Sequence, residues 1–176
     1  MELVSPCLGY ELEFARFYDD FVQHDVDNAG YYQQGKADFS AYIQSLADEA
    51  AGINLQEDHV PCSHFWLVSG SPNTDKAILG AIRVRHHIEN AFLAWEAGHI
   101  GYDIAPSYRG LGHGTLMLSL ALPQAKALGI ETALVVADED NLASRKVIEA
   151  NGGIFEKVVL GKVFPEPLAR YWVSCQ

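Results

Sequence analysis

Cysteine is scarce in this 176-residue chain, and long apolar runs are missing from it. The three cysteines, Cys7, Cys62 and Cys175, are scattered, odd in number and outside any CxxC pair, so a disulfide framework is excluded. No apolar run reaches the length of a membrane span, and the acidic start does not resemble a secretory signal. We therefore expect free thiols in a cytoplasmic protein that does not bind a membrane.

Basic residues are few as well. Twelve Lys and Arg stand against 23 Asp and Glu, which gives a net charge of −11. A nucleic-acid partner would need its backbone phosphates neutralised, so that class of partner is not expected. An acidic surface attracts a cationic substrate, but it also serves solubility alone, and both interpretations remain open here.

Two catalytic signatures and a complete metal motif are also missing. The chain contains neither the G-x-S-x-G elbow of a serine hydrolase nor the glycine-lysine loop of nucleotide hydrolases. The stretch HVPCSH places His59, Cys62 and His64 close together, but zinc usually takes four ligands, or three and a water. We expect no metal, and interpret this stretch as a loop leading into a strand.

Apolar periodicity and turn residues divide the chain into alternating elements. The predicted helices cover 10–23, 38–52, 113–128 and 138–152. The predicted strands cover 64–70, 77–88, 98–105, 132–138, 153–160 and 168–174, with a turn at 71–75 joining the first two as a hairpin. This order predicts an α/β (α+β) protein, with a mixed sheet covered by helices on both faces in a single domain of residues 1–176.

A glycine-rich turn, SYRGLGHGTLML, leads into the most apolar of these helices. Glycine costs a helix about 1 kcal/mol per interior position, so Gly110, Gly112 and Gly114 require another explanation. Glycine permits positive φ and lets an outside group approach the backbone, while a helix N-terminus offers free N–H groups and a positive dipole. The combination favours a phosphate site, and a plain tight turn is the alternative.

The residue pattern of the turn is more specific evidence than its glycine content alone. It has the pattern R-x-x-G-x-G from Arg109 to Gly114, after a strand that ends in Ile104-Ala105-Pro106. After one more strand comes NLASRKVIEANGG, residues 141–153. In this order the two motifs resemble those of the GNAT-type N-acetyltransferases, and the resemblance extends over most of residues 64–172. It implies a mixed sheet of six to seven strands with a splayed parallel pair, about four flanking helices, and acetyl-CoA as co-substrate.

The resemblance also implies which residues bind acetyl-CoA. Backbone amides of residues 110–115 would hold its pyrophosphate, and the CoA-binding residues of the turn are Arg109, Gly110, Leu111, Gly112, His113, Gly114 and Thr115. The pantetheine arm would contact Asn141, Ser144 and the backbone of Ile104 and Ala105. Tyr31 and Tyr32 lie between the first two predicted helices, where such proteins often line the acceptor cleft; an ordinary packed loop is the alternative.

The expected reaction is direct attack by a primary amine, small-molecule or peptide, on the thioester. An alkylamine must first lose a proton, and Glu96 and His99 are the candidate bases just before the pantetheine strand. A solvated carboxylate and a surface histidine are the alternative interpretations. Many members of the family carry a tyrosine that protonates the departing CoA thiolate, and Ile148 occupies that position here. Ser144 and Tyr102 are therefore the candidates for this general acid.

Polyamines, amino acids, aminoglycosides and protein N-termini remain open as acceptors, with a homodimer through the last strands as a further expectation. The rival function is a non-catalytic acyl-CoA-binding module. Release of thiol from acetyl-CoA in the presence of amines would distinguish the enzyme from that module.

Overall fold

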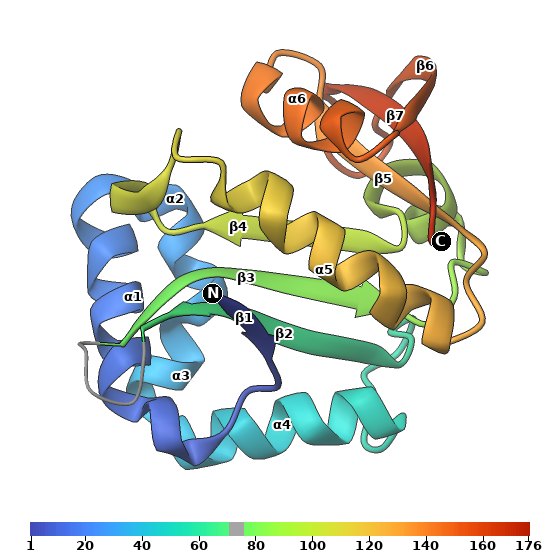
Figure 1. The fold of residues 1–176 in the computed structure, drawn as a ribbon. Helices are drawn as coiled ribbons and strands as arrows, with labels where there is room; N and C mark the ends of the chain where they lie inside the picture. The colour runs from blue at the N-terminus through green and yellow to red at the C-terminus, as the bar shows by residue number, and fades with distance from the viewer. Residues whose placement is uncertain (71–75) are drawn as a thin grey trace.

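The computed structural model describes residues 1–70 and 76–176 (Figure 1). Within these ranges its α-helices are α1 (Glu11–His24), α2 (Val26–Ala29), α3 (Gln33–Ala37), α4 (Phe39–Ala51), α5 (His113–Ala127) and α6 (Leu142–Ala150). Its strands are β1 (Glu2–Val4), β2 (Cys62–Ser69), β3 (Ala77–Arg85), β4 (Ile100–Ile104), β5 (Thr132–Asp138), β6 (Ile154–Leu160) and β7 (Pro167–Ser174). Short helical turns are η1 (Leu8–Tyr10), η2 (Gly30–Tyr32), η3 (Leu93–Ala97) and η4 (Pro106–Tyr108).

The strands form one mixed sheet in the order β1-β2-β3-β4-β5-β7-β6. Neighbours run antiparallel except β4 and β5, which are parallel. In the described part of the chain, the ladder between β4 and β5 consists of Ile100 opposite Val135 alone, so these strands separate beyond that point. The predicted mixed sheet with a splayed parallel pair is confirmed.

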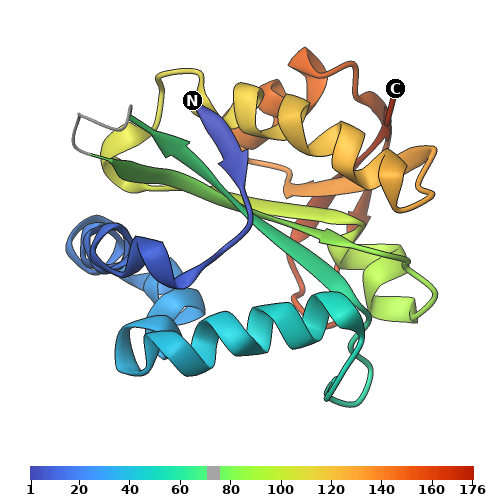
Figure 2. The same cartoon turned by 60° about the horizontal axis from the view of Figure 1, so that its bottom comes forward.

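Helices cover both faces of this sheet (Figure 2). α5 and α6 pack on one face, where the apolar core includes Met117, Leu118 and Ile148. The α1–α4 segment covers the other face, where Phe14 and Trp66 belong to a largely aromatic core. Both faces of the central strands are therefore buried, in agreement with the nearly continuous apolar runs of their sequences.

Several local signals gave the correct element ends. Asp38 caps α4, since its carboxylate accepts a 3.0 Å hydrogen bond from the Ala41 N–H. Gly52 ends that helix with a φ of 71°, as expected of a C-terminal glycine. The hairpin of β2 and β3 is antiparallel as predicted; its turn, 71–75, lies outside the described residues.

The structure differs from the sequence-based elements in three places. The polar stretch expected as a loop between α1 and α4 folds into α2, η2 and α3, and within α3 Gly35 lies against the Phe14 ring, where a Cβ would collide with it. β3 ends at Arg85 and does not extend to residue 88, so His86 and His87 lie beyond the strand. β1 and η3 were not predicted. None of the helices in the described ranges has the length and apolar character needed to cross a bilayer.

Candidate active site

The glycine turn joins β4 to α5 at the open side of the splayed pair. Gly110 and Gly112 have φ values of 75° and 82°, and no described atom comes within 4 Å of a Cβ built on either. Their backbone conformation, and not crowding, therefore requires glycine. The Leu116 N–H donates to the Gly112 carbonyl at 3.1 Å, so the amides of residues 113–115 precede the first helical donor. The turn presents bare donors to an outside group.

Gly114 is required for a different reason. A Cβ at this position would lie 3.0 Å from Cγ2 of Val147 and 3.6 Å from Cγ1 of Ile104. The missing side chain lets α6 approach the first turn of α5 closely. Gly114 therefore sets the distance between the two helices beside the gap.

The remaining turn residues have varied surroundings. The Leu111 side chain is exposed, and the ring of His113 meets that of Tyr108 edge-on at 6.4 Å between centroids. The Thr115 carbonyl accepts a 3.2 Å hydrogen bond from Nδ2 of Asn151. These contacts hold the first turn of α5 in place and leave its N–H groups facing outward.

The backbone N–H and C=O groups of β4 point alternately toward β3 and toward β5. Ala105 donates its N–H to the Leu79 carbonyl at 2.9 Å, and its own carbonyl accepts from the Tyr108 N–H at 2.8 Å. Because successive residues alternate in direction, Tyr102 and Ile104 turn their backbone groups toward β5. The Ile104 carbonyl accepts from Arg109 Nε at 2.9 Å. The N–H and carbonyl of Tyr102 and the N–H of Ile104 therefore face the gap.

Tyr102, Ser144 and Asn141 come together at this gap. The Tyr102 hydroxyl lies 2.8 Å from Ser144 Oγ and 3.2 Å from the Ser144 carbonyl oxygen. The Asn141 side chain caps α6 by accepting a 3.1 Å hydrogen bond from the Ser144 N–H. Burial raises the pKa of Tyr102 to about 12, so its hydroxyl keeps its proton at neutral pH.

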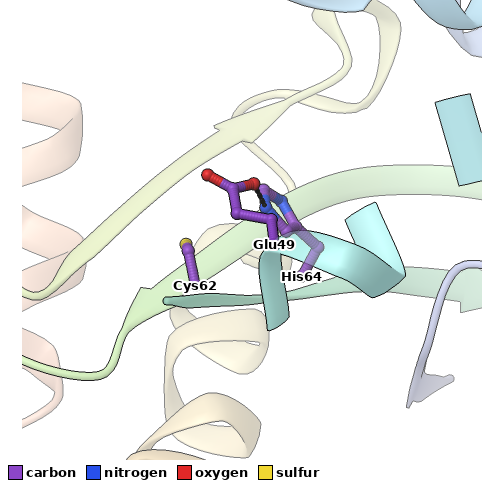
Figure 3. Close-up of side chains that lie close together, drawn as sticks. All are labelled: Glu49, Cys62 and His64. Atoms are coloured by element: carbon purple, nitrogen blue, oxygen red, sulfur yellow. Dashed lines mark hydrogen bonds and ion pairs between the residues drawn. The ribbon is translucent and has the colours of Figure 1, made fainter. Parts of the chain in front are cut away.

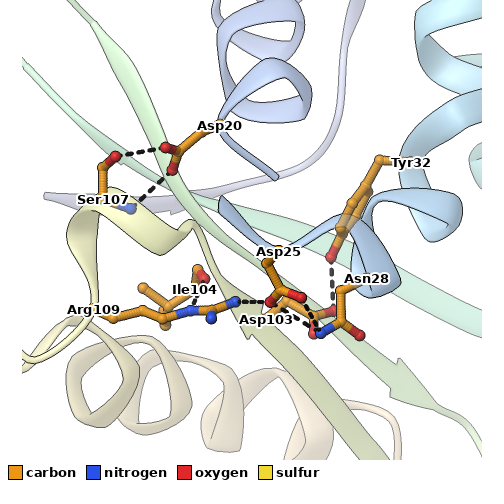
Figure 4. A network of polar contacts seen from close by, with 8 residues as sticks. All are labelled: Asp20, Asp25, Asn28, Tyr32, Asp103, Ile104, Ser107 and Arg109. Carbon is orange, nitrogen blue, oxygen red and sulfur yellow. Dashed lines mark hydrogen bonds and ion pairs between the residues drawn. The ribbon is translucent and has the colours of Figure 1, made fainter. Parts of the chain in front are cut away.

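Arg109 turns away from the glycine backbone (Figure 4). Its guanidinium forms an ion pair with Asp25, just beyond the end of α1. Next to it, the N–H of Ser107 donates to Asp20 at 2.9 Å, and the Ser107 hydroxyl donates to the same carboxylate. The end of α1 is therefore fastened to the segment that carries the turn. Sequence reasoning missed both aspartates, whose partners are more than 80 positions away along the chain.

Glu96 lies in η3 with 7% of its surface exposed. Its carboxylate accepts hydrogen bonds from the backbone N–H groups of Lys162, Val163 and Phe164, at 2.6, 3.0 and 3.2 Å. Desolvation acts to raise the pKa of Glu96, but the three amides outweigh it and lower the pKa below its ordinary value. The carboxylate therefore stays charged and holds the loop before β7.

His99 bridges the start of the splayed strands. The side-chain Nδ1 of His99 accepts a 2.9 Å hydrogen bond from the Leu134 N–H, while the backbone N–H of His99 donates to the Leu134 carbonyl at 2.7 Å. Burial, with the nearby Arg85 and His87, lowers the pKa of His99 below its ordinary value. The imidazole is therefore neutral, with its proton on Nε2. The acceptor atoms of both predicted bases are already hydrogen-bonded.

A cavity of about 470 Å³ lies on the face of the sheet that the α1–α4 segment covers, opposite α5 and α6, between η2, α4, β2 and β3. Tyr31 and Tyr32 line it. Arg83 also lines it and forms a 3.2 Å ion pair with Asp103 on β4, which accepts a 2.7 Å hydrogen bond from the Tyr32 hydroxyl. The Arg83 guanidinium lies over the Tyr31 ring at 5.6 Å.

The sheet register connects this cavity to the strand beside the gap. His64 on β2, Arg83 on β3 and Gly101 on β4 are directly opposite one another, so they share one face. A Cβ on Gly101 would lie 3.0 Å from Arg83 Nε. The bare backbone of Gly101 thus lets the guanidinium lie across β4. The Arg83 side chain therefore lies between the cavity and β4.

A splayed parallel pair opens beside a glycine-bearing helix N-terminus, which is the arrangement that the resemblance of the sequence motifs implied. The family model for the acetyltransferase (GNAT) domain matches residues 14–154. The chain belongs to this family, and the acetyltransferase assignment and its acetyl-CoA co-substrate are confirmed at the level of the family. No curated protein sequence matches the chain closely enough to indicate a relationship.

Solved structures share the fold at low sequence identity. RimJ from Mycobacterium smegmatis, in complex with CoA-disulfide, has a TM-score of 0.68 at 14% identity, over 98% of this chain and 80% of that one. RimL, a ribosomal L7/L12 α-N-protein acetyltransferase in complex with CoA, has a TM-score of 0.66 at 15% identity, over 98% of this chain and 92% of that one. A spermidine N-acetyltransferase SpeG chimera, from Vibrio cholerae and hSSAT, has a TM-score of 0.63 at 13% identity, over 99% of this chain and 96% of that one.

Proposed function

We propose that residues 1–176 form one domain that transfers the acetyl group of acetyl-CoA to a primary amine by direct attack. The observation that carries the proposal is the position of the α5 N-terminus beside the gap between β4 and β5. A polar extended arm fits between two strands that no longer pair, and its anionic end fits a helix N-terminus. Few other ligand shapes match both features.

The CoA pyrophosphate binds the backbone amides of residues 110–115. The pantetheine arm pairs with the free backbone groups of Tyr102 and Ile104, since both groups of Ala105 are used within the chain. The Asn141 side-chain amide borders the same gap. Arg109, already paired with Asp25, supports the turn from behind and does not contact phosphate directly.

The acceptor amine occupies the cavity on the opposite face and reaches the thioester at the middle of β4. Asp48 and Glu49 line this cavity, and the positive charge of Arg83 is balanced by Asp103. This lining and the net charge of −11 support a cationic acceptor. Two of the similar structures are a spermidine N-acetyltransferase and a ribosomal-protein α-N-acetyltransferase, which supports an amine of one of these kinds.

In the reaction, the amine nitrogen bonds to the carbonyl carbon, and the carbon–sulfur bond breaks. The Tyr102 N–H points toward the gap and stabilises the oxygen that becomes negative; one such donor contributes about 3 to 4 kcal/mol. The Tyr102–Ser144 hydroxyl pair gives a proton to the departing thiolate. The amine gives its proton to water in the cavity, because the acceptor atoms of Glu96 and His99 are engaged elsewhere.

The protein forms a homodimer through β6, the last strand of the sheet. Ile154, Phe155 and Leu160 on this strand are exposed apolar side chains, next to unpaired backbone groups. A second copy placed edge to edge would pair those groups and cover the apolar side chains.

Thiol release tests the proposal against the non-catalytic module. The purified protein, acetyl-CoA and a thiol reagent are mixed with spermidine, single amino acids, an aminoglycoside and a short peptide with a free N-terminus. We expect rapid thiol release with at least one amine, and the acetylated amine by mass spectrometry. CoA binding without acetylation of any amine class would favour the module.

A further inference from the structure

Three side chains of types that can ligate a metal, Glu49, Cys62 and His64, lie close together (Figure 3), and two of them, Glu49 and His64, line the cavity. Glu49 comes from the last turns of α4, and Cys62 and His64 come from the start of β2. A carboxylate oxygen, the sulfur and an imidazole nitrogen all lie within 4.8 Å of one another. The Glu49 Oε2 and His64 Nε2 atoms are 2.6 Å apart. Three different kinds of ligand atom therefore converge on one small volume.

A fourth side chain, that of His59, lies next to Glu49. His59, in the segment between α4 and β2, has its Nδ1 3.9 Å from Oε1 of Glu49. Its side chain is half-exposed, so the imidazole can turn without disturbing the core. Cys62 and His64 are two residues apart on one strand, which puts them on the same face of the sheet. The four ligands come from a helix, a connecting segment and a strand.

We propose that Glu49, Cys62, His64 and His59 bind a zinc ion. Zinc favours tetrahedral sulfur, nitrogen and oxygen ligands at about 2.0 to 2.3 Å, which places neighbouring ligand atoms about 3.5 Å apart. Reaching that spacing requires side-chain rotation of the kind that the exposed His59 allows. One thiolate and one carboxylate balance the two positive charges of the ion.

Cys62 is buried, and its sulfur lies close to the Glu49 carboxylate. A divalent cation bound between them would displace the thiol proton. The site differs from a plain Glu–His hydrogen bond in having buried sulfur on its other side.

An ion at this position would cross-link two elements of the fold. It would join the end of α4 to the start of β2 and hold the connecting segment, residues 52–61, against the sheet. Glu49, His59 and His64 also line the acceptor cavity, so the ion would sit in the wall of that cavity. Metal binding itself does not depend on the proposed acetyl transfer.

Cobalt titration tests the site directly. The tag-free protein, reduced and freed of metal by a chelator, is titrated with Co²⁺, and the absorbance of thiolate-to-cobalt charge transfer is followed. We expect one equivalent to bind, with zinc displacing the cobalt. The Cys62→Ser variant should lose the band, while Cys175→Ser, which removes another buried thiol, should keep it. No band in the native protein, or a band that survives Cys62→Ser, would overturn the proposal.

A second variant covers the case in which Cys62→Ser does not fold. His59→Ala changes a half-exposed residue, so the fold should survive. We expect its zinc affinity, measured by competition with a chelating dye, to fall at least about tenfold. Zinc should also raise the melting temperature of the native protein more than that of His59→Ala. Equal affinity and equal stabilisation in the two proteins would contradict the four-ligand site.

Discussion

The hydroxyl of Tyr102 lies 2.8 Å from the Oγ of Ser144, so a strand and a helix on either side of the gap share one hydrogen bond. Because the pKa of Tyr102 is raised to about 12, the pair keeps its protons throughout the neutral and mildly alkaline range. A proton donor therefore stands ready at the position where the proposed reaction releases a thiolate. Ile148 is buried in the core and has no proton to donate, so in the proposed reaction the Tyr102–Ser144 pair is the general acid.

Removing either hydroxyl should slow the chemical step. We expect Tyr102→Phe and Ser144→Ala each to lower kcat by about 10- to 100-fold, with little change in KM for acetyl-CoA, because general acid catalysis acts only in the transition state. Ser119→Ala, which removes an exposed hydroxyl from α5, is the control and should leave kcat unchanged. Steady-state kinetics that find wild-type kcat in both Tyr102→Phe and Ser144→Ala would remove the pair from the mechanism.

The pH profile separates a water-mediated proton transfer from a side-chain base. In the proposed mechanism, kcat/KM rises with pH as the amine itself loses its proton, about tenfold per unit below an amine pKa near about 10.4. Glu96→Gln and His99→Ala should keep this acidic limb, although both should lower the melting temperature because they break buried hydrogen bonds. If either variant abolishes the limb while it remains folded, that residue is the base predicted from sequence.

A cationic acceptor should show its charge in the salt dependence of the reaction. Salt at about 0.1 M shortens the reach of a charge to about 10 Å, so kcat/KM for a cationic amine should fall as salt is added. Asp48→Asn, in the cavity, should reduce this dependence, and Glu131→Gln, exposed beyond the end of α5, should not. An anionic acceptor that outperforms every cationic one would contradict the assignment.

The β6 edge predicts a dimer that a charge can dissociate. We expect light scattering after size exclusion to give the mass of a dimer for the native chain, and of a monomer for Ile154→Lys combined with Leu160→Lys. Leu12→Lys, an equally exposed apolar position on α1, is the control and should stay dimeric. A native monomer, or a double variant that remains dimeric, would exclude this interface.

Sequence patterns were most informative where one local rule decides the structure. Asp38 and Gly52 marked the ends of α4, and Gly110 and Gly112 marked the entry to α5, because capping and positive φ depend on neighbouring backbone alone. The parallel pair followed from the order of strands and helices around β4 and β5. Local spacing therefore predicted the frame of the CoA site.

Contacts across the chain could not be predicted in this way. The R-x-x-G-x-G pattern placed Arg109 among the CoA-binding residues, but its guanidinium pairs with Asp25, which is 84 positions away along the chain. Glu96 looked like a free carboxylate until the loop after β6 supplied three amides. Glu49 joins Cys62 and His64 only because α4 packs on β2. Each of these partners is set by tertiary packing, which a single sequence does not display.

The central claim is that the turn before α5 binds CoA through bare backbone, and calorimetry on two matched glycine variants tests it most directly. Gly112 and Gly129 flank the same helix, with φ values of 82° and 87° and open space at each Cβ. A valine at either site costs a similar backbone strain of about 1 to 2 kcal/mol. The account predicts that Gly112→Val weakens CoA binding at least about 100-fold while Gly129→Val binds like the native protein. Native affinity in Gly112→Val, or equal losses in both variants, would contradict it.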